Sequence, residues 1–161
     1  MKTLILMRHA KSSWDLSVAD QDRPLQQRGI TDAYLVAKEF SVMKLNIDAC
    51  YSSPANRALH TAMIALKTLD FPLEKFQVSK ELYDFSGHSV MEFVKNLDNK
   101  LNTVLIFGHN HAFTEIVNLW GSKAIENLPT AGLVELIFET DNWARIESGK
   151  TKTVLMPKQL R

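Results

Sequence analysis

The chain has 161 residues, of which 45% are hydrophobic and 23% are charged, and this composition is typical of one globular domain. Its 19 Lys and Arg residues nearly balance its 18 Asp and Glu residues, and the net charge of +1 argues against a general nucleic-acid binder. The apolar runs are far too short for a membrane-spanning helix, and a single cysteine, Cys50, excludes an internal disulfide.

The same features set expectations about organisation and location. No repeat, low-complexity tract or linker divides the sequence, so we expect one domain over residues 1–161, and we assume a monomer. Only the short apolar run Leu4–Met7 precedes Arg8, which is too little for the core of a signal peptide. We therefore expect a cytoplasmic protein whose partners include neither nucleic acid nor a membrane.

The first half of the chain alternates between strand and helix patterns. Thr3–Met7 is a continuous apolar run, typical of a strand buried on both faces. From Gly29 onward, apolar residues recur at helical spacing, at Ile30, Ala33, Tyr34, Ala37 and Phe40. Residues 46–51 again resemble a strand. Ser53 and Pro54 then resemble an N-cap and a first helical position, and the buried face of that helix is expected to contain Ala58, Ala62, Ala65, Leu66 and Leu69.

The second half continues this alternation. Two more helices are expected, one from Ser86 or Gly87 to about Leu97 and one from Ala112 to Trp120. The strand-like segments are residues 76–78, 103–107, 133–138 and 143–146, the last two forming a closing pair. This order of elements predicts an α/β fold, a three-layer α/β/α sandwich with a mostly parallel central sheet.

Arginine and histidine follow three of the predicted strands. Arg8 and His9 follow the first strand, Arg57 comes soon after the second, and His109 follows the strand over residues 103–107. Because the carboxyl ends of parallel strands meet at one edge of a sheet, we expect these side chains to lie close together. Arg57 would lie in the first turn of its helix, where free N–H groups also favour an anion. The sequence therefore predicts a phosphate or carboxylate site.

The chemistry of such a site can be narrowed further. The chain has no G-x-x-x-x-G-K-[ST] loop and no G-x-G-x-x-G loop, so side chains must hold the phosphate. Two arginines supply the positive charge that phosphoryl transfer needs, so we expect neither a metal nor a cofactor. A neutral imidazole is a competent nucleophile toward phosphorus, and His9, beside Arg8 at the end of a buried strand, is the best-placed candidate.

Four segments, in chain order, resemble the motifs of the histidine phosphatase superfamily, which has the phosphoglycerate mutase-like fold, and most closely its small SixA-like phosphohistidine phosphatase branch. The resemblance extends from residue 4 to about residue 120. The four segments are Arg8-His9-Ala10, Asp22-Arg23-Pro24-Leu25 with Arg28-Gly29, Ser52-Ser53-Pro54 through Arg57 to Thr61-Ala62, and Gly108-His109-Asn110.

The resemblance implies roles for these residues. His9 would be the phosphorylated nucleophile, and Arg8, Arg57 and His109 would complete the phosphate pocket. The residues assigned to substrate binding are Arg23, which is equally suited to anchor its own loop, Asn110 and Lys11. The substrate would be a phosphohistidine-bearing protein or a small phosphomonoester. The least matched segments, residues 11–22 and 82–90, are expected to form the rim that sets specificity.

Other interpretations remain open at this point. The pair His109-x-His111 could belong to a metal site, but no carboxylate or cysteine accompanies it at ligand spacing, and His111 is more typical of a helix start. The pocket could also serve a phosphomutase, or a phosphate- or phosphopeptide-binding protein without turnover. Intact His9, Arg8, Arg57 and His109 favour an enzyme, and the missing insertions argue against a mutase.

A general acid is not identified by any motif. Larger relatives carry a Glu or Asp acid in an insertion for which this chain has no room. Glu81, Asp84 and His88 lie in the corresponding stretch but match no motif, and Asp84 is better suited to cap a helix. An N-phosphorylated imidazole that is protonated on its other nitrogen leaves as neutral imidazole, so a site without an acid favours phosphoramidates or activated esters.

Overall fold

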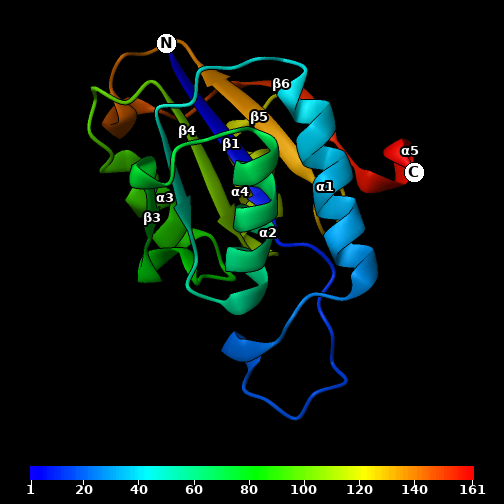
Figure 1. Cartoon of the computed structure of the whole chain (residues 1–161). Coiled ribbons are helices and arrows are strands. Elements are labelled where there is room, and N and C mark those ends of the chain that lie inside the picture. Colours follow the sequence, from blue (N-terminus) through cyan, green and yellow to red (C-terminus); the bar gives the residue numbers. More distant parts are fainter.

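A computed structural model describes residues 1–161 and contains a six-stranded sheet in the order β3-β2-β4-β1-β5-β6 (Figure 1). The strands are β1 (Lys2–Arg8), β2 (Ala49–Ser52), β3 (Phe76–Val78), β4 (Thr103–Gly108), β5 (Leu133–Phe138) and β6 (Lys150–Leu155). β1, β4, β2 and β3 pair in parallel, whereas β5 is antiparallel to both of its neighbours, β1 and β6. The expectation of a mostly parallel α/β sheet is confirmed.

Helices cover both faces of this sheet. They are α1 (Gln27–Ser41), α2 (Asn56–Thr68), α3 (His88–Lys95), α4 (Ala112–Trp120) and the short α5 (Pro157–Leu160). Side chains alternate between the two faces of a strand, so Ile5 packs into the core under α1 and α2, and Leu6 into the core under α3 and α4. Both are fully buried, as the continuous apolar pattern of β1 predicts.

The prediction of a closing pair of strands is wrong for its second strand, which was expected over residues 143–146. Residues 143–145 form a 3₁₀ turn, and the strand that pairs with β5 is β6. Trp143 is fully buried against the core, and its indole Nε1 donates a hydrogen bond to the carbonyl of Leu101 (2.8 Å). β6 lies at the edge of the sheet, and its first residues alternate between exposed lysines and threonines. Its sequence therefore lacks the apolar run of a central strand.

Two details of the predicted helices also differ. The second helix begins at Asn56 with Ala55 in the N-cap position, so Ser53 and Pro54 lie in the turn before it. Tyr34, which belonged to the expected buried stripe of the first helix, is 47% exposed, and Val36 is buried instead. Ala58, Ala62, Ala65 and Leu66 are buried as predicted, whereas Leu69 is partly exposed.

The connection between β1 and α1 leaves the carboxyl edge of the sheet and projects beyond the rest of the molecule (Figure 1). It includes a single 3₁₀ turn over Asp20–Asp22. The loops that leave β2 and β4 start from the same edge. No helix combines the length and the apolar character that crossing a bilayer requires.

Candidate active site

The predicted arginines and histidines meet at the carboxyl edge of the sheet. Arg8 ends β1 and is paired in register with Gly108, which ends β4, so His9 and His109 follow two neighbouring strands. Their ring centroids are 5.3 Å apart. Arg57 lies in the first turn of α2, after β2, which pairs with the other side of β4. Strand register therefore brings together side chains that are a hundred residues apart.

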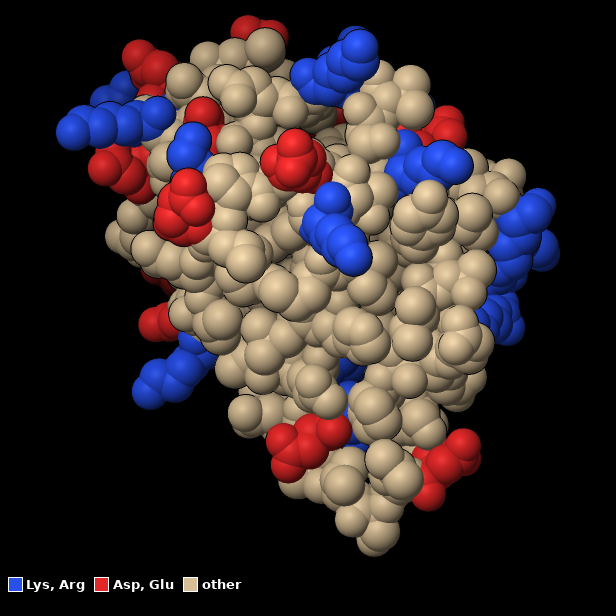
Figure 2. Space-filling model, in the orientation of Figure 1, with Lys and Arg blue, Asp and Glu red and all other residues tan.

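These side chains surround a cavity of about 330 Å³. It is lined by the predicted residues Arg8, His9, Lys11, Arg23, Arg57 and Asn110, together with Ser12, Trp14, Asp20, Phe85 and Thr130. His109 is fully buried beside His9. Figure 2 shows basic atoms deep in a hollow between the body of the molecule and the projecting loop, with acidic side chains on either side.

The hydrogen bonding of His9 leaves one ring nitrogen free. Its Nδ1 lies 2.8 Å from the carbonyl oxygen of Ala10, and a carbonyl only accepts, so Nδ1 carries the hydrogen and Nε2 keeps its lone pair. The amide of Ala10 in turn donates to Thr61 Oγ1 (2.9 Å), which holds that carbonyl in place. Burial lowers the pKa of His9 to about 3, and the charges of Arg57 and Arg8 contribute in the same direction. His9 is therefore a neutral imidazole at ordinary pH.

His109 has the opposite arrangement. Its Nε2 lies 2.8 Å from the hydroxyl oxygen of Ser53, which already accepts the amide hydrogen of Ala55 (3.2 Å). The hydroxyl hydrogen of Ser53 has no acceptor other than His109 Nε2, so we assign it to that nitrogen, and this leaves the ring hydrogen on Nδ1. Burial, followed by the charge of Arg57, lowers the pKa of His109 to about 3. His109 is thus neutral and presents an N–H donor.

Three buried side-chain nitrogen atoms have no hydrogen-bond partner, and all three belong to this site. They are Arg8 Nε, Arg57 Nε and His109 Nδ1. Buried polar groups in proteins are nearly always hydrogen-bonded. Arg8 and Arg57 line the cavity and His109 lies beside His9, so the three nitrogen atoms fit a multivalent oxyanion. The pKa of Arg8 is lowered by burial and by the nearby charge of Arg57, and a bound anion would relieve both effects.

The guanidinium groups of Arg8 and Arg57 also make hydrogen bonds within the protein through their Nη atoms. Arg8 Nη1 donates to the carbonyl of Leu128 (2.8 Å). Arg57, only 2% exposed, donates from Nη1 to the backbone carbonyl of Asp20 (2.6 Å) and from Nη2 to its carboxylate (2.9 Å). A guanidinium has five N–H donors, so Arg57 retains Nε and further N–H bonds for a ligand.

The three residues assigned to substrate binding all line the cavity, but in different ways. Arg23 is buried, donates to Ser12 Oγ (2.7 Å) and stacks against Trp14, with its guanidinium carbon 3.5 Å from the ring centroid. Lys11 is exposed at the mouth. Asn110 uses its amide to bind neighbouring segments: Nδ2 donates to Asn127 (2.6 Å) in the connection after α4, and Oδ1 accepts from Thr114 in α4.

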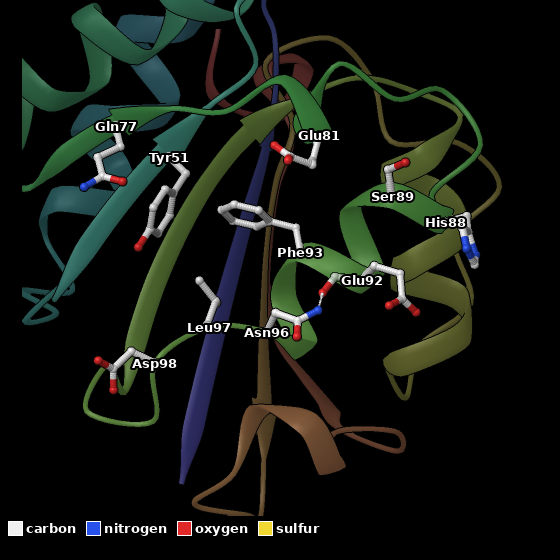
Figure 3. A pocket seen from close by; sticks show the side chains of 10 residues that line it. All are labelled: Tyr51, Gln77, Glu81, His88, Ser89, Glu92, Phe93, Asn96, Leu97 and Asp98. Atoms are coloured by element: carbon white, nitrogen blue, oxygen red, sulfur yellow. Dashed lines mark hydrogen bonds between the residues drawn. The ribbon is translucent and has the colours of Figure 1, made fainter.

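The three residues considered as general acids lie outside this cavity. Asp84 caps α3 by accepting the amide hydrogens of Gly87 (3.0 Å) and Val90 (3.1 Å). Glu81 and His88 line a separate, larger groove of about 470 Å³ beside α3 (Figure 3). That groove contains neither arginine nor the two buried histidines, so its size does not make it the reactive site.

The interpretation of His109 and His111 as a metal site finds no third ligand-type side chain. His111 is exposed, whereas His109 is fully buried. No group of three or more His, Cys, Asp or Glu side chains is placed to hold a metal ion.

Two residues of the site carry no sequence signal. Asp20 accepts hydrogen bonds from Arg57, Arg23 and Tyr83, and Tyr83 comes from a segment 63 residues further along the chain. Both lie in the segments 11–22 and 82–90 that were expected to form the rim. A match to their positions in related motifs was the only signal that could have identified them, and these segments match least.

Comparison with known proteins identifies related sequences over most of the chain. The model of the histidine phosphatase superfamily (branch 1) matches residues 4–88, more than half of the chain. An uncharacterised protein of Mycobacterium tuberculosis is 29% identical over 153 residues, covering 89% of this chain and 93% of that protein. A 2,3-bisphosphoglycerate-dependent phosphoglycerate mutase of Gloeothece citriformis is 38% identical over 69 residues, covering 41% of this chain and 30% of the mutase.

Solved structures match the whole fold. The protein histidine phosphatase SixA complexed with tungstate superposes with a TM-score of 0.82 at 22% identity, covering 99% of both chains. A putative phosphohistidine phosphatase SixA from Agrobacterium tumefaciens superposes with a TM-score of 0.80 at 20% identity, covering 97% of this chain and 98% of that one. The three-layer arrangement and the sheet are therefore shared with these proteins.

Proposed function

The chain belongs to the histidine phosphatase superfamily, and on this premise we propose that it is a metal-independent phosphatase that transfers the phosphoryl group of its substrate first to His9 and then to water. The observation that carries the proposal is the set of three unpartnered donors, Arg8 Nε, Arg57 Nε and His109 Nδ1, beside the free Nε2 of a neutral His9. Two arginines provide the positive charge that a metal ion provides in other phosphoryl-transfer sites.

In the first step, the phosphoryl oxygens contact the free donors of Arg8, Arg57 and His109. The lone pair of His9 Nε2 forms the new N–P bond, and the bond from phosphorus to the leaving group breaks with its electron pair on that group. The positive charge that develops on the His9 ring is stabilised by the hydrogen bond from Nδ1 to the carbonyl of Ala10.

In the second step, water attacks the phosphorus of phospho-His9. The N–P bond breaks, its electron pair returns to Nε2, and the proton lost by water goes to the product phosphate or to solvent. The hydrogen on Nδ1 stays in place throughout, so His9 leaves as a neutral imidazole and is ready for another cycle.

We propose a phosphohistidine-bearing protein or a small phosphomonoester as substrate. The mouth of the cavity is open, because Lys11 is exposed and Trp14 is 74% exposed, so a bulky phosphorylated partner can approach. The similar fold of SixA, a protein histidine phosphatase solved with the tetrahedral oxyanion tungstate, supports this choice. A mutase would instead need to enclose and reorient its intermediate, for which an open mouth is poorly suited.

The test is hydrolysis of p-nitrophenyl phosphate in the presence of EDTA by the native chain, by His9→Ala and by His60→Ala. We expect His9→Ala to lose activity by about 10³-fold or more, as expected for removal of a nucleophile. His60 is an exposed imidazole one turn after Arg57 on α2, so its variant controls for the loss of a histidine as such. Acid quenching of the native enzyme should trap an acid-labile phosphoryl group that His9→Ala lacks.

Three outcomes would contradict the proposal. Unchanged activity of His9→Ala would show that His9 is not the nucleophile. Tight binding of vanadate without turnover of any phosphohistidine or ester would indicate a phosphate-binding protein. A phosphoenzyme that passes its phosphoryl group to a sugar phosphate faster than to water would indicate a mutase.

A further inference from the structure

A carboxylate stands at the mouth of the phosphate cavity. Asp20 Oδ2 accepts hydrogen bonds from Arg57 Nη2 (2.9 Å) and from the hydroxyl of Tyr83, and Oδ1 accepts from Arg23 Nε (3.2 Å). Asp20 lines the same cavity as His9, and its side chain is 46% exposed. It can therefore be reached by the part of a substrate that extends from the phosphoryl group toward solvent.

The contacts of Asp20 keep it ionised. The hydroxyl of Tyr83, together with Arg57 and Arg23, lowers the pKa of this carboxyl to about 2, although burial acts in the opposite direction. At neutral pH Asp20 thus has no proton to give to a leaving group, but it can accept hydrogen bonds. Oδ1 has a single partner, Arg23, and a carboxylate oxygen can accept more than one hydrogen bond.

We propose that Asp20 determines leaving-group specificity by accepting a hydrogen bond from the N–H of a departing imidazole, so that the site prefers N-phosphorylated imidazoles over phosphate esters. The inference rests on the proposed reaction through phospho-His9 and names the class of substrate that this site takes. It assigns a task to a residue that otherwise only orients two arginines.

The atoms of the transfer balance without any further reactant. The lone pair of His9 Nε2 forms the new N–P bond, and the N–P bond of the substrate breaks with its electron pair on the leaving nitrogen. The leaving ring already carries a proton on its other nitrogen, and Asp20 holds that proton through a hydrogen bond. The ring therefore leaves as neutral imidazole, while His9 Nδ1–H is held by the Ala10 carbonyl in the corresponding way.

A phosphate ester meets the opposite environment. Its leaving oxygen gains negative charge as the O–P bond breaks and must be protonated or strongly stabilised. The ionised carboxylate of Asp20 supplies no proton and repels this charge. An aryl ester such as p-nitrophenyl phosphate, whose leaving group is a stable anion, is therefore tolerated, whereas an alkyl ester is disfavoured.

The test compares two substrates, phosphoimidazole and p-nitrophenyl phosphate, in the native chain, in Asp20→Asn and in Asp22→Asn. We expect Asp20→Asn to lower kcat/KM for phosphoimidazole relative to p-nitrophenyl phosphate by about 10- to 100-fold, the range of one hydrogen bond to a charged group. Asp22 lies on the same 3₁₀ turn, is exposed and does not line the cavity, so Asp22→Asn should leave the ratio unchanged.

The ratio separates this inference from a structural role of Asp20. If Asp20 only orients Arg57 and Arg23, both substrates lose activity in parallel, the ratio stays constant and the inference is overturned. It is also overturned if the native chain hydrolyses p-nitrophenyl phosphate but not phosphoimidazole, although the reaction through His9 would then stand. If the native chain turns over neither substrate, the proposed function fails as well.

Discussion

Two imidazole rings lie side by side in this site, yet their hydrogen-bond partners give them opposite tautomers. The Ala10 carbonyl holds a hydrogen on Nδ1 of His9, so its Nε2 presents a lone pair. The Ser53 hydroxyl occupies Nε2 of His109, so its Nδ1 presents a hydrogen. One ring is thereby equipped to attack phosphorus and the other to donate a hydrogen bond to a phosphoryl oxygen. One backbone acceptor, the Ala10 carbonyl, and one side-chain donor, the Ser53 hydroxyl, thus separate the proposed nucleophile from the proposed hydrogen-bond donor.

This arrangement predicts the effect of Ser53→Ala. Without the hydroxyl, nothing fixes the tautomer of His109, and part of the population presents a lone pair to the phosphoryl oxygens. We expect kcat/KM to fall by about 10-fold, which corresponds to one hydrogen bond of about 1.4 kcal/mol. The ¹⁵N chemical shifts of the His109 ring should change from one tautomer to a mixture.

Ser52→Ala is the matched control. Ser52 is equally buried, and its hydroxyl donates to the carbonyl of Ser53 (2.9 Å) rather than to a ring. Its variant should show a similar cost in stability with unchanged ¹⁵N shifts. Unchanged shifts in Ser53→Ala would disprove the role of the hydroxyl.

The sequence was a good guide to the residues that follow buried strands and a poor guide to those that reach the site through loops. Arg8, His9 and His109 could be placed because β1 and β4 are continuous apolar runs whose ends are evident. Asp20 could not, because its contacts with Arg57 and Tyr83 depend on the path of an exposed loop. No periodic pattern encodes such a path.

The start of α1 is held against the segment that follows His9, the proposed nucleophile. The backbone N–H of Gln26 donates to the carbonyl of Lys11 (2.9 Å), and its side-chain Nε2 donates to the carbonyl of Ser12 (3.1 Å). Gly29 permits this approach, because a Cβ there would lie 2.3 Å from the carbonyl oxygen of Lys11. The helix therefore sets the position of the chain just after His9.

Two opposing effects decide the outcome of Gly29→Ala. In an unobstructed helix, replacing glycine by alanine stabilises by about 0.5–1 kcal/mol. Here the added methyl group would collide with backbone, and overpacking of this kind costs about 1–3 kcal/mol. We expect Gly29→Ala to lower the free energy of unfolding in urea and to lower kcat/KM, because the Lys11 segment must move.

Arg28→Ala serves as the control for this turn, because the side chain of Arg28 is 62% exposed and does not line the cavity of His9. It should change neither quantity by a comparable amount. A Gly29→Ala variant as stable and as active as the native chain would contradict the packing argument.

Helices and strands with a clear apolar pattern could be predicted from the sequence, whereas the strand β6 at the edge of the sheet could not. α4 and β5 have the predicted bounds because their apolar residues have clear helical and strand patterns. The sequence does not predict β6, because an edge strand with solvent-facing lysines needs no apolar run. It predicts a strand over residues 143–146 instead, although Trp143 fills the core from a 3₁₀ turn. Tertiary packing, rather than local preference, decides such segments.

For the molecule as a whole, the net charge of +1 gives no sign of the arginines gathered at the proposed anion site. Arg8, Arg23 and Arg57 line one cavity, while acidic side chains lie around its mouth (Figure 2). The fold keeps two buried imidazoles neutral beside these guanidinium groups, whereas the same rings in the unfolded chain would bind protons. The free energy of unfolding therefore depends on pH.

The sign follows from the two pKa values. His9 and His109 have a pKa of about 3 in the folded protein, against an ordinary value of 6.5. Below pH 6.5 the unfolded chain therefore binds protons that the folded chain does not, and stability falls as pH falls. Each ring contributes a slope of up to about 1.4 kcal/mol per pH unit between pH 6.5 and 5, where carboxyl groups titrate little.

Urea unfolding at several pH values between 7 and 5, in a buffer without phosphate, measures this slope. His9→Gln and His109→Gln should each reduce it by up to about 1.4 kcal/mol per pH unit, whatever their stability at pH 7. His60→Gln, at an exposed position on α2, should leave it unchanged. If the native slope persists in both buried-histidine variants, the acid sensitivity of the fold has another source, and the two rings are not held neutral by burial.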